Sequence, residues 1–128
     1  MSVFELGYRY LLPSINRRLV EKLWELGLMK IEIARKLKLS HSAVSRYLSM
    51  QRGYFINLRR FPDVEEMIAK LALTIKEKNL SIYDIQKEIL KIALYVLSRK
   101  YLCEYHAKIS LGIEPDKCNI CPTIFHIS

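Results

Sequence analysis

The sequence predicts an all-α protein in which a three-helix core with a helix-turn-helix precedes two longer helices. Three observations support this: apolar residues recur at helical spacing, Gly and Pro number only four each, and the net positive charge lies in the first half of the chain. With 128 residues, 51% of them hydrophobic, the chain can bury one core without disulfides. We predict a helix-turn-helix domain over 1–60, a helical hairpin over 61–106 and a tail over 107–128.

A first helix is expected between Pro13 and Gly27. Proline is favoured in the first turn of a helix, and glycine is favoured just beyond its end. The apolar residues between them fall three or four positions apart, as one buried helix face requires. They are Ile15, Leu19, Val20, Leu23, Trp24 and Leu26.

Two short helices follow, over 30–38 and about 40–49, and together they predict the helix-turn-helix. Ala34 is the small residue expected where the two helices approach most closely, and Ser40 is the N-cap of the second. The apolar set around the turn is Ile33, Leu37, Leu39, Val44 and Leu48. Lys38 stands where such turns usually hold glycine, so we expect it to adopt a left-handed backbone conformation at a cost of about 1 kcal/mol.

Beyond Gly53 and a basic, aromatic connector over 54–62, two longer helices are predicted, over about 63–78 and from Ser81 to about residue 104. The fifth helix carries two apolar stripes. They are Ile82, Ile85, Ile89, Ile92 and Val96 on one side, and Leu90, Leu94, Leu97 and Tyr101 on the other. One stripe can pack on the fourth helix, and the second predicts a homodimer interface. The alternative is that the N-terminal helices cover both faces.

The charge distribution predicts a polyanionic partner. Residues 1–60 hold 12 Lys and Arg against four Asp and Glu, whereas residues 61–128 hold nine of each. The formal net charge of +8 is therefore confined to the first half, while a charge kept only for solubility would be spread along the chain. No apolar run approaches the roughly 18–20 residues of a membrane span, and no signal peptide is visible, so we expect a cytoplasmic protein without a membrane partner.

The third helix is expected to meet DNA through its outer, N-terminal face. Its predicted base contacts are His41, Ser42, Ser45 and Arg46, and Arg46 can fork onto the O6 and N7 atoms of guanine. Six basic residues are predicted to contact phosphates: Arg17, Arg18, Arg35, Lys36, Lys38 and Arg52. The connector aromatics Tyr54, Phe55 and Phe61 are expected either to stack on bases or to join the core.

Five short segments between Leu12 and Gly53 carry a resemblance to a known group of proteins. They are Leu12-Pro13, Ile33-Ala34, Ala43-Val44-Ser45, Tyr47-Leu48-Ser49 and Arg52-Gly53. In these segments the chain resembles archaeal predicted transcriptional regulators with a Cro/lambda-repressor-type helix-turn-helix. The resemblance implies that fold and DNA binding, and it leaves the operator open. Members of this family also tend to end in a short cysteine-bearing segment, as this chain does.

The tail has the ligand spacing of a metal site: Cys103-x2-His106-x11-Cys118-x2-Cys121. This spacing predicts a structural zinc ion. The alternatives are an iron–sulfur centre completed by His126 or His106, and a metal-free tail with buried or disulfide-bonded cysteines. No catalytic acid, base or cofactor loop accompanies the cluster, so we expect the protein to have no enzymatic activity. No small-molecule effector is identifiable from the sequence.

Together these features predict a sequence-specific transcriptional regulator that binds double-stranded DNA as a homodimer. Two rival hypotheses remain open. One is a metal- or redox-sensing switch centred on the Cys/His cluster, with DNA binding as its output. The other is an RNA- or protein-binding module that uses the same fold.

Overall fold

The structure is a computed structural model that describes residues 1–110, 112 and 114–125, and every regular element in these residues is a helix. The predicted all-α class is therefore confirmed. The elements are α1 (Val3–Leu6), the π-helical turn η1 (Gly7–Leu11), α2 (Leu12–Glu25), α3 (Lys30–Leu37), α4 (His41–Leu48), the 3₁₀ turn η2 (Leu58–Arg60), α5 (Pro62–Glu77), α6 (Ile82–Ser98), α7 (Cys103–Ile109) and α8 (Ile120–Ile124). None of these helices is both long and apolar enough to cross a bilayer.

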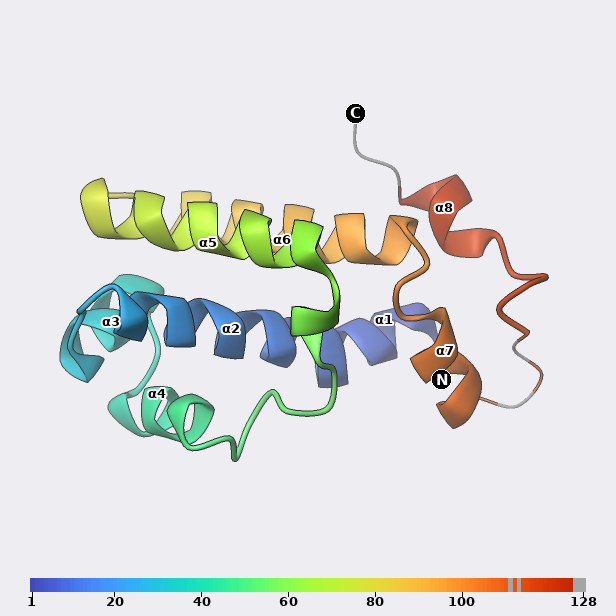
Figure 1. The fold of residues 1–128 in the computed structure, drawn as a ribbon, viewed down its shortest axis with the longest axis horizontal. Helices are drawn as coiled ribbons and strands as arrows, with labels where there is room; N and C mark the ends of the chain where they lie inside the picture. Colours follow the sequence, from blue (N-terminus) through green and yellow to red (C-terminus); the bar gives the residue numbers. More distant parts are fainter. Residues whose placement is uncertain (111, 113, 126–128) are drawn as a thin grey trace.

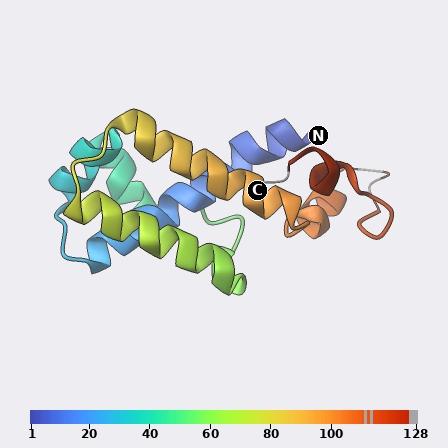
Figure 2. The ribbon, with the colours of Figure 1, turned by 90° about the horizontal axis from the view of Figure 1, so that it is seen from above.

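The helices are arranged around α2 (Figure 1). The hairpin of α5 and α6 covers one side of α2, and α3 and α4 pack at its C-terminal end. The α7 and α8 helices lie at the opposite end, near α1 (Figures 1 and 2). One buried core runs across the predicted boundary at residue 60, because α2 packs against both α4 and α5.

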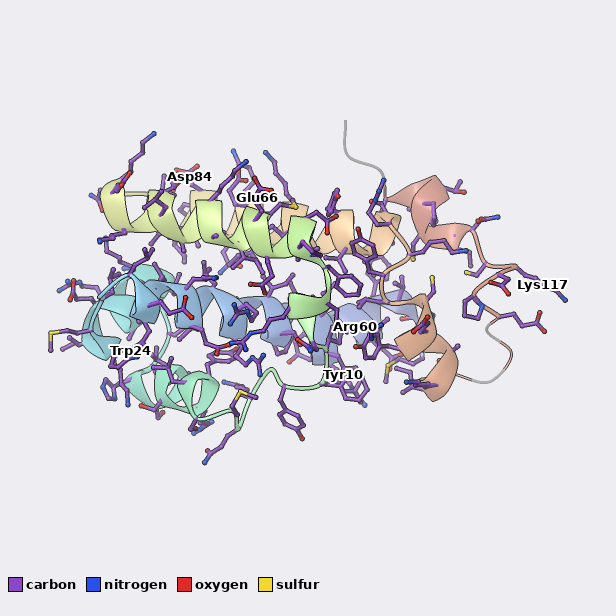
Figure 3. The ribbon with its side chains drawn as sticks, viewed as in Figure 1. Tyr10, Trp24, Arg60, Glu66, Asp84 and Lys117 are labelled. Atoms are coloured by element: carbon purple, nitrogen blue, oxygen red, sulfur yellow. The ribbon has the colours of Figure 1, made fainter. Side chains whose placement is uncertain are left out.

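The first helix begins earlier than predicted. Helical backbone starts at Val3 and runs into α2 through η1, so Pro13 lies inside a longer helical stretch. Proline lacks an N–H, and its ring crowds the carbonyl four residues before it, which explains why the preceding turn widens into a π-helix. Most of the predicted stripe of α2 is buried, but Trp24 lies at the surface near α4 (Figure 3).

The fifth predicted helix is shorter than expected. Its helix, α6, ends at Ser98 and not near residue 104, because Lys100 takes a left-handed φ of 61° and the chain turns before α7 begins. This turn places Leu102 in the core and directs the Tyr101 hydroxyl to Asp63, to which it donates a hydrogen bond of 2.7 Å. Contacts with the rest of the fold therefore favour the break.

The two stripes of α6 differ in burial. Ile85, Ile89, Ile92 and Val96 are buried within the chain, whereas Leu90 and Leu94 of the second stripe are exposed. Leu97, further along the second stripe, is buried, and α8 packs against α6. The second stripe is therefore covered only towards its C-terminal end.

Candidate nucleic-acid interface

The turn between α3 and α4 has the local geometry that the sequence predicts. Lys38 adopts a left-handed conformation, with φ 55° and ψ 41°, which confirms the expectation for this position. The N–H of Leu39 donates to the carbonyl of Ala34 at 2.9 Å, closing the end of α3. Ser40 caps α4, since its hydroxyl accepts a hydrogen bond of 3.1 Å from the N–H of Ala43. The direction of α4 is therefore set by local hydrogen bonds as well as by packing.

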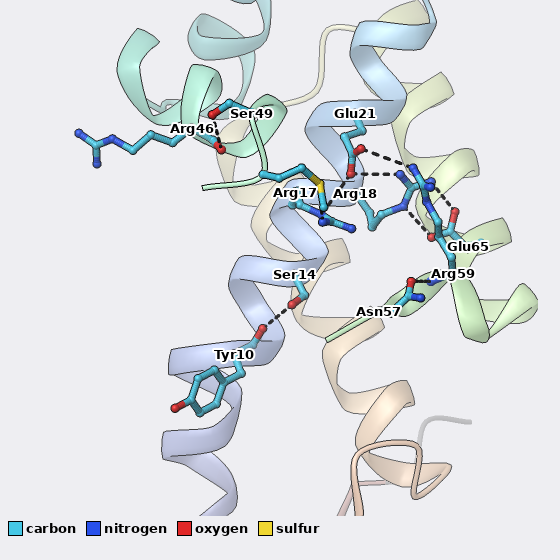
Figure 4. A network of polar contacts seen from close by, with 11 residues as sticks. Tyr10, Ser14, Arg17, Arg18, Glu21, Arg46, Ser49, Asn57, Arg59 and Glu65 are labelled. Atoms are coloured by element: carbon cyan, nitrogen blue, oxygen red, sulfur yellow. Dashed lines mark hydrogen bonds and ion pairs between the residues drawn. The ribbon is translucent and has the colours of Figure 1, made fainter. Parts of the chain in front are cut away.

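One face of α4 is locked into the core and the other is free. Ala43, Val44 and Tyr47 are buried, and the helix packs against both α2 and α3. Of the predicted base contacts, His41, Ser42 and Arg46 are exposed, and Ser45 is half-buried beside Trp24. The Arg46 side chain extends away from the body of the protein (Figure 4). The four predicted residues thus share the outer side of one rigidly held helix.

Arg17 and Arg18, predicted as phosphate contacts, are buried instead. Their side chains are only 6% and 3% exposed. Arg18 donates two hydrogen bonds to Glu65 of α5, at 2.8 Å to Oε1 and 2.7 Å to Oε2 (Figure 4). Glu21 Oε1 lies 3.2 Å from Arg17 Nε and 3.1 Å from Arg18 Nη1. Both arginines are matched by carboxylates inside the protein, so neither side chain is exposed to a phosphate.

The carboxylate of Glu65 is tuned by this pairing. Burial alone would raise the pKa of Glu65, but the hydrogen bonds and positive charge of Arg18 outweigh that effect and hold the pKa below its ordinary value. The pKa of Arg18 is raised, chiefly by its hydrogen bonds to Glu65. Both groups therefore stay charged at neutral pH. The sequence held one signal of this arrangement, because Glu21 follows the two arginines at helical spacing.

The other predicted phosphate contacts lie in two places. Arg35, Lys36 and Lys38 line a hollow of about 430 Å³ beside the turn between α5 and α6, together with Lys78. Arg52 follows α4, with its guanidinium carbon 5.7 Å from the centre of the Tyr47 ring. Of these predicted phosphate contacts, Arg52 lines the same surface as Tyr47 at the end of α4.

The connector aromatics are divided between interior and surface. Phe61 stacks on Tyr101 at a centroid separation of 4.2 Å, so it belongs to the packing of the hairpin. Phe55 stacks on Tyr10, also at 4.2 Å, but it remains exposed at the surface together with Tyr54. Sequence reasoning singled out the connector and missed its partner Tyr10, because only the fold brings residues 45 positions apart into contact.

The tail brings part of the predicted metal cluster together. Cys103, His106 and Cys121 line one cavity of only about 10 Å³, while His106 Nε2 lies 2.7 Å from the carbonyl oxygen of Met1. Over residues 1–110, 112 and 114–125, no group of three or more His, Cys, Asp or Glu side chains is arranged to hold a metal ion. The three cysteines are free, and burial raises the pKa of Cys103 and of Cys121. His126 lies outside the described residues.

No family model, curated protein or solved structure matches this chain. The resemblance to archaeal regulators therefore stays a prediction from the sequence segments quoted above. Any assignment of function has to rest on the exposed face of α4, on the charge distribution and on the surfaces around them.

Proposed function

We propose that the protein is a cytoplasmic, sequence-specific transcriptional regulator that binds duplex DNA through a helix-turn-helix formed by α3 and α4. The observation that carries this proposal is the two-sided character of α4. Its buried side is fixed by Ala43, Val44 and Tyr47, while His41, Ser42 and Arg46 face outward. A helix that reads base edges in the major groove needs both properties, because a mobile helix would hold no register on the bases.

The charge that remains at the surface supports a polyanionic partner. The two arginines and two glutamates of the buried cluster cancel one another, so the net charge of +8 is carried entirely by other side chains. Arg46 and Arg52 make no ion pair with a carboxylate in the described part of the protein. Their charges are available to phosphates or base edges, with release of condensed counterions.

We also propose that two copies associate through the exposed part of α6. Leu90 and Leu94 form an apolar pair one helical turn apart, on the stripe from which a dimer interface is predicted. The opposite stripe is largely buried inside the chain, so Leu90 and Leu94 are the members of the two stripes that stay exposed to a second copy. A two-fold dimer would present two α4 helices to two half-sites of an operator.

Selection of bound duplexes from a random pool tests the function. A two-fold symmetric consensus is expected, and recovery of no consensus would refute sequence-specific recognition. Sedimentation at tens of micromolar tests the dimer, with Leu90→Glu expected to give a folded monomer. Leu73→Glu, on the neighbouring α5, is the matched control, because Leu73 is 44% exposed and Leu90 is 51% exposed. A wild-type monomer, or equal effects of the two substitutions, would contradict the proposed interface.

For the tail we propose a structural zinc ion bound by Cys103, His106, Cys118 and Cys121. The ligand spacing and the cavity shared by three of these residues support it. In the arrangement described above they do not yet form a ligand set, so His106 would have to leave the Met1 carbonyl. About one zinc per chain, released by a chelator, is the expected result of elemental analysis. Zinc-free protein with three titratable thiols would show that the cysteines bind no metal and contribute only to packing.

A further inference from the structure

A groove of about 520 Å³ lies beside the C-terminal end of α4. One wall is η1 with the start of α2, and the other is the segment 51–55. Gly53 fixes the distance between them: its φ is +70°, and a Cβ added there would lie 2.3 Å from the carbonyl oxygen of Pro13. Only glycine allows the segment to pack this closely on α2, so the shape of the groove depends on this residue.

The groove is lined by aromatic rings and arginines. Phe55 stacks on Tyr10, and Tyr8 and Tyr54, which also line the groove, are largely exposed. Arg9 and Arg52 supply two positive charges. Within the part of the chain that the structure describes, no carboxylate lines this groove. The combination of free ring faces and unneutralised guanidinium groups suits a ligand that is both flat and anionic.

The same chemistry continues towards α7. Phe55 lies 5.9 Å from the ring of Tyr105, and Arg60 donates a hydrogen bond of 3.4 Å to the Tyr105 hydroxyl. Tyr105 thereby links Arg60 to the stacked rings of Phe55 and Tyr10, and Figure 3 labels Tyr10 and Arg60. Aromatic rings and arginines therefore lie together from the groove to α7, as in proteins that bind a nucleic-acid strand.

We infer that this groove binds unpaired nucleotides of a single-stranded nucleic acid, with bases stacked on Tyr54 and Tyr8 and phosphates held by Arg9 and Arg52. A base in a duplex offers only its edges to a protein, whereas an unpaired base offers the flat face that an exposed ring can stack on. The volume can hold about one nucleotide, so the remaining nucleotides would lie on the exposed rings that line the groove. This activity goes beyond duplex recognition, because it uses none of the residues on the outer face of α4 and shares only Arg52 with the proposed duplex contacts.

Fluorescence polarisation with a labelled oligothymidylate of about ten nucleotides tests the inference on the full chain. Binding is expected, and an abasic strand of equal length should bind at least about tenfold more weakly, because it keeps the phosphates and lacks the bases. Equal affinity for the two strands would overturn the inference. An oligouridylate of the same length shows whether the unpaired strand is DNA or RNA; tight binding of either supports the groove, and binding of neither overturns it.

Substitutions locate the site. Tyr54→Ala combined with Tyr8→Ala should weaken oligothymidylate binding by at least about tenfold, whereas Tyr54→Phe, which keeps the ring, should bind as the wild type does. Tyr83→Ala is the matched control, because Tyr83 is a highly exposed tyrosine on α6. Unchanged binding by the double variant would overturn the inference. Arg46→Ala should lose specific duplex binding and keep single-strand binding, so the two activities can fail separately.

Discussion

Two pairs of arginines in the N-terminal half share one residue type and differ in almost everything else. Arg17 and Arg18 are buried in α2 and matched by Glu21 and Glu65, whereas Arg46 and Arg52 are exposed on or just after α4. In the amino-acid composition all four arginines contribute equally to the net charge. The difference is that the fold buries Arg17 and Arg18 beside carboxylates, whereas it leaves Arg46 and Arg52 exposed and without a carboxylate partner in the described residues.

The buried pair also supports the surface that carries the exposed pair. Arg18 joins α2 to α5 through Glu65, and Arg17 donates from Nη1 to the Met50 sulfur at 2.9 Å, just after α4. Arg59 reaches the same cluster through Glu21, at 3.5 Å. The buried cluster therefore helps to hold the chain on both sides of the groove residues 51–55 in place.

The largest expected effect comes from breaking the buried pair. Glu65→Ala leaves the Arg18 charge inside the protein without its main partner, and we expect a loss of roughly 3–5 kcal/mol in the free energy of unfolding. The matched control is Glu66→Ala, whose ion pair with Lys70 is exposed and whose removal should change stability by less than about 0.5 kcal/mol. Urea denaturation measures both. Similar losses of stability in the two variants would show that the buried Arg18–Glu65 pair contributes no more than the exposed Glu66–Lys70 pair.

Arg46→Ala should show the reverse pattern, with stability retained and recognition lost. One base pairing by an arginine contributes roughly 1–3 kcal/mol of discrimination, so affinity for the selected operator should fall more than affinity for random duplex. Titration of the two duplexes measures the difference. An equal fall for both would mean that Arg46 contacts a phosphate and not a base.

Salt dependence sharpens the comparison further. Arg52→Ala should reduce the slope of log affinity against log salt by about 0.9, the value expected for one phosphate contact in B-DNA. Arg17→Met removes a buried charge instead, and the slope should stay unchanged if the folded protein is compared. Should both variants flatten the slope equally, Arg17 would have to be reachable by DNA after all.

Lowering the pH should reduce the stability of the folded protein gradually. Burial opposes ionisation of Glu65 and Asp63, but Arg18 in one case and the hydroxyls of Tyr95 and Tyr101 in the other hold each pKa below its ordinary value, 4.5 for Glu65 and 3.8 for Asp63. The unfolded chain then binds protons at higher pH than the folded one. The stabilisation is complete above the ordinary pKa values and is lost as pH falls through the lower folded ones.

Thermal unfolding between pH 7 and pH 3 measures this loss. Glu65→Gln should be less stable than the wild type at pH 7, and its melting temperature should fall less steeply in acid. If the melting temperature of the wild type stayed constant as the pH was lowered below 4, this result would contradict the assigned pKa directions.

The local features of the fold were predictable because their causes lie within a few residues. The cap at Ser40, the left-handed Lys38 and the buried stripe from Ile85 to Val96 each depend on neighbours along one helix or turn. The α-helical class follows from the same periodicity. The sequence by itself therefore determined the helical class, the five main helices and which face of α4 is polar. It did not determine the helical turns before Pro13 or the early end of α6.

The tertiary structure decided what depends on residues far apart in the chain. Glu65 lies 47 positions from Arg18, and this pairing turned a predicted phosphate contact into a buried ion pair. Tyr101 turns back to Asp63, 38 positions away, in the segment where α6 ends early. The groove exists because Gly53 docks on Pro13. Helical spacing in the sequence indicates only which face of a helix is apolar. Whether a charged side chain is buried depends on which oppositely charged residue another helix places beside it.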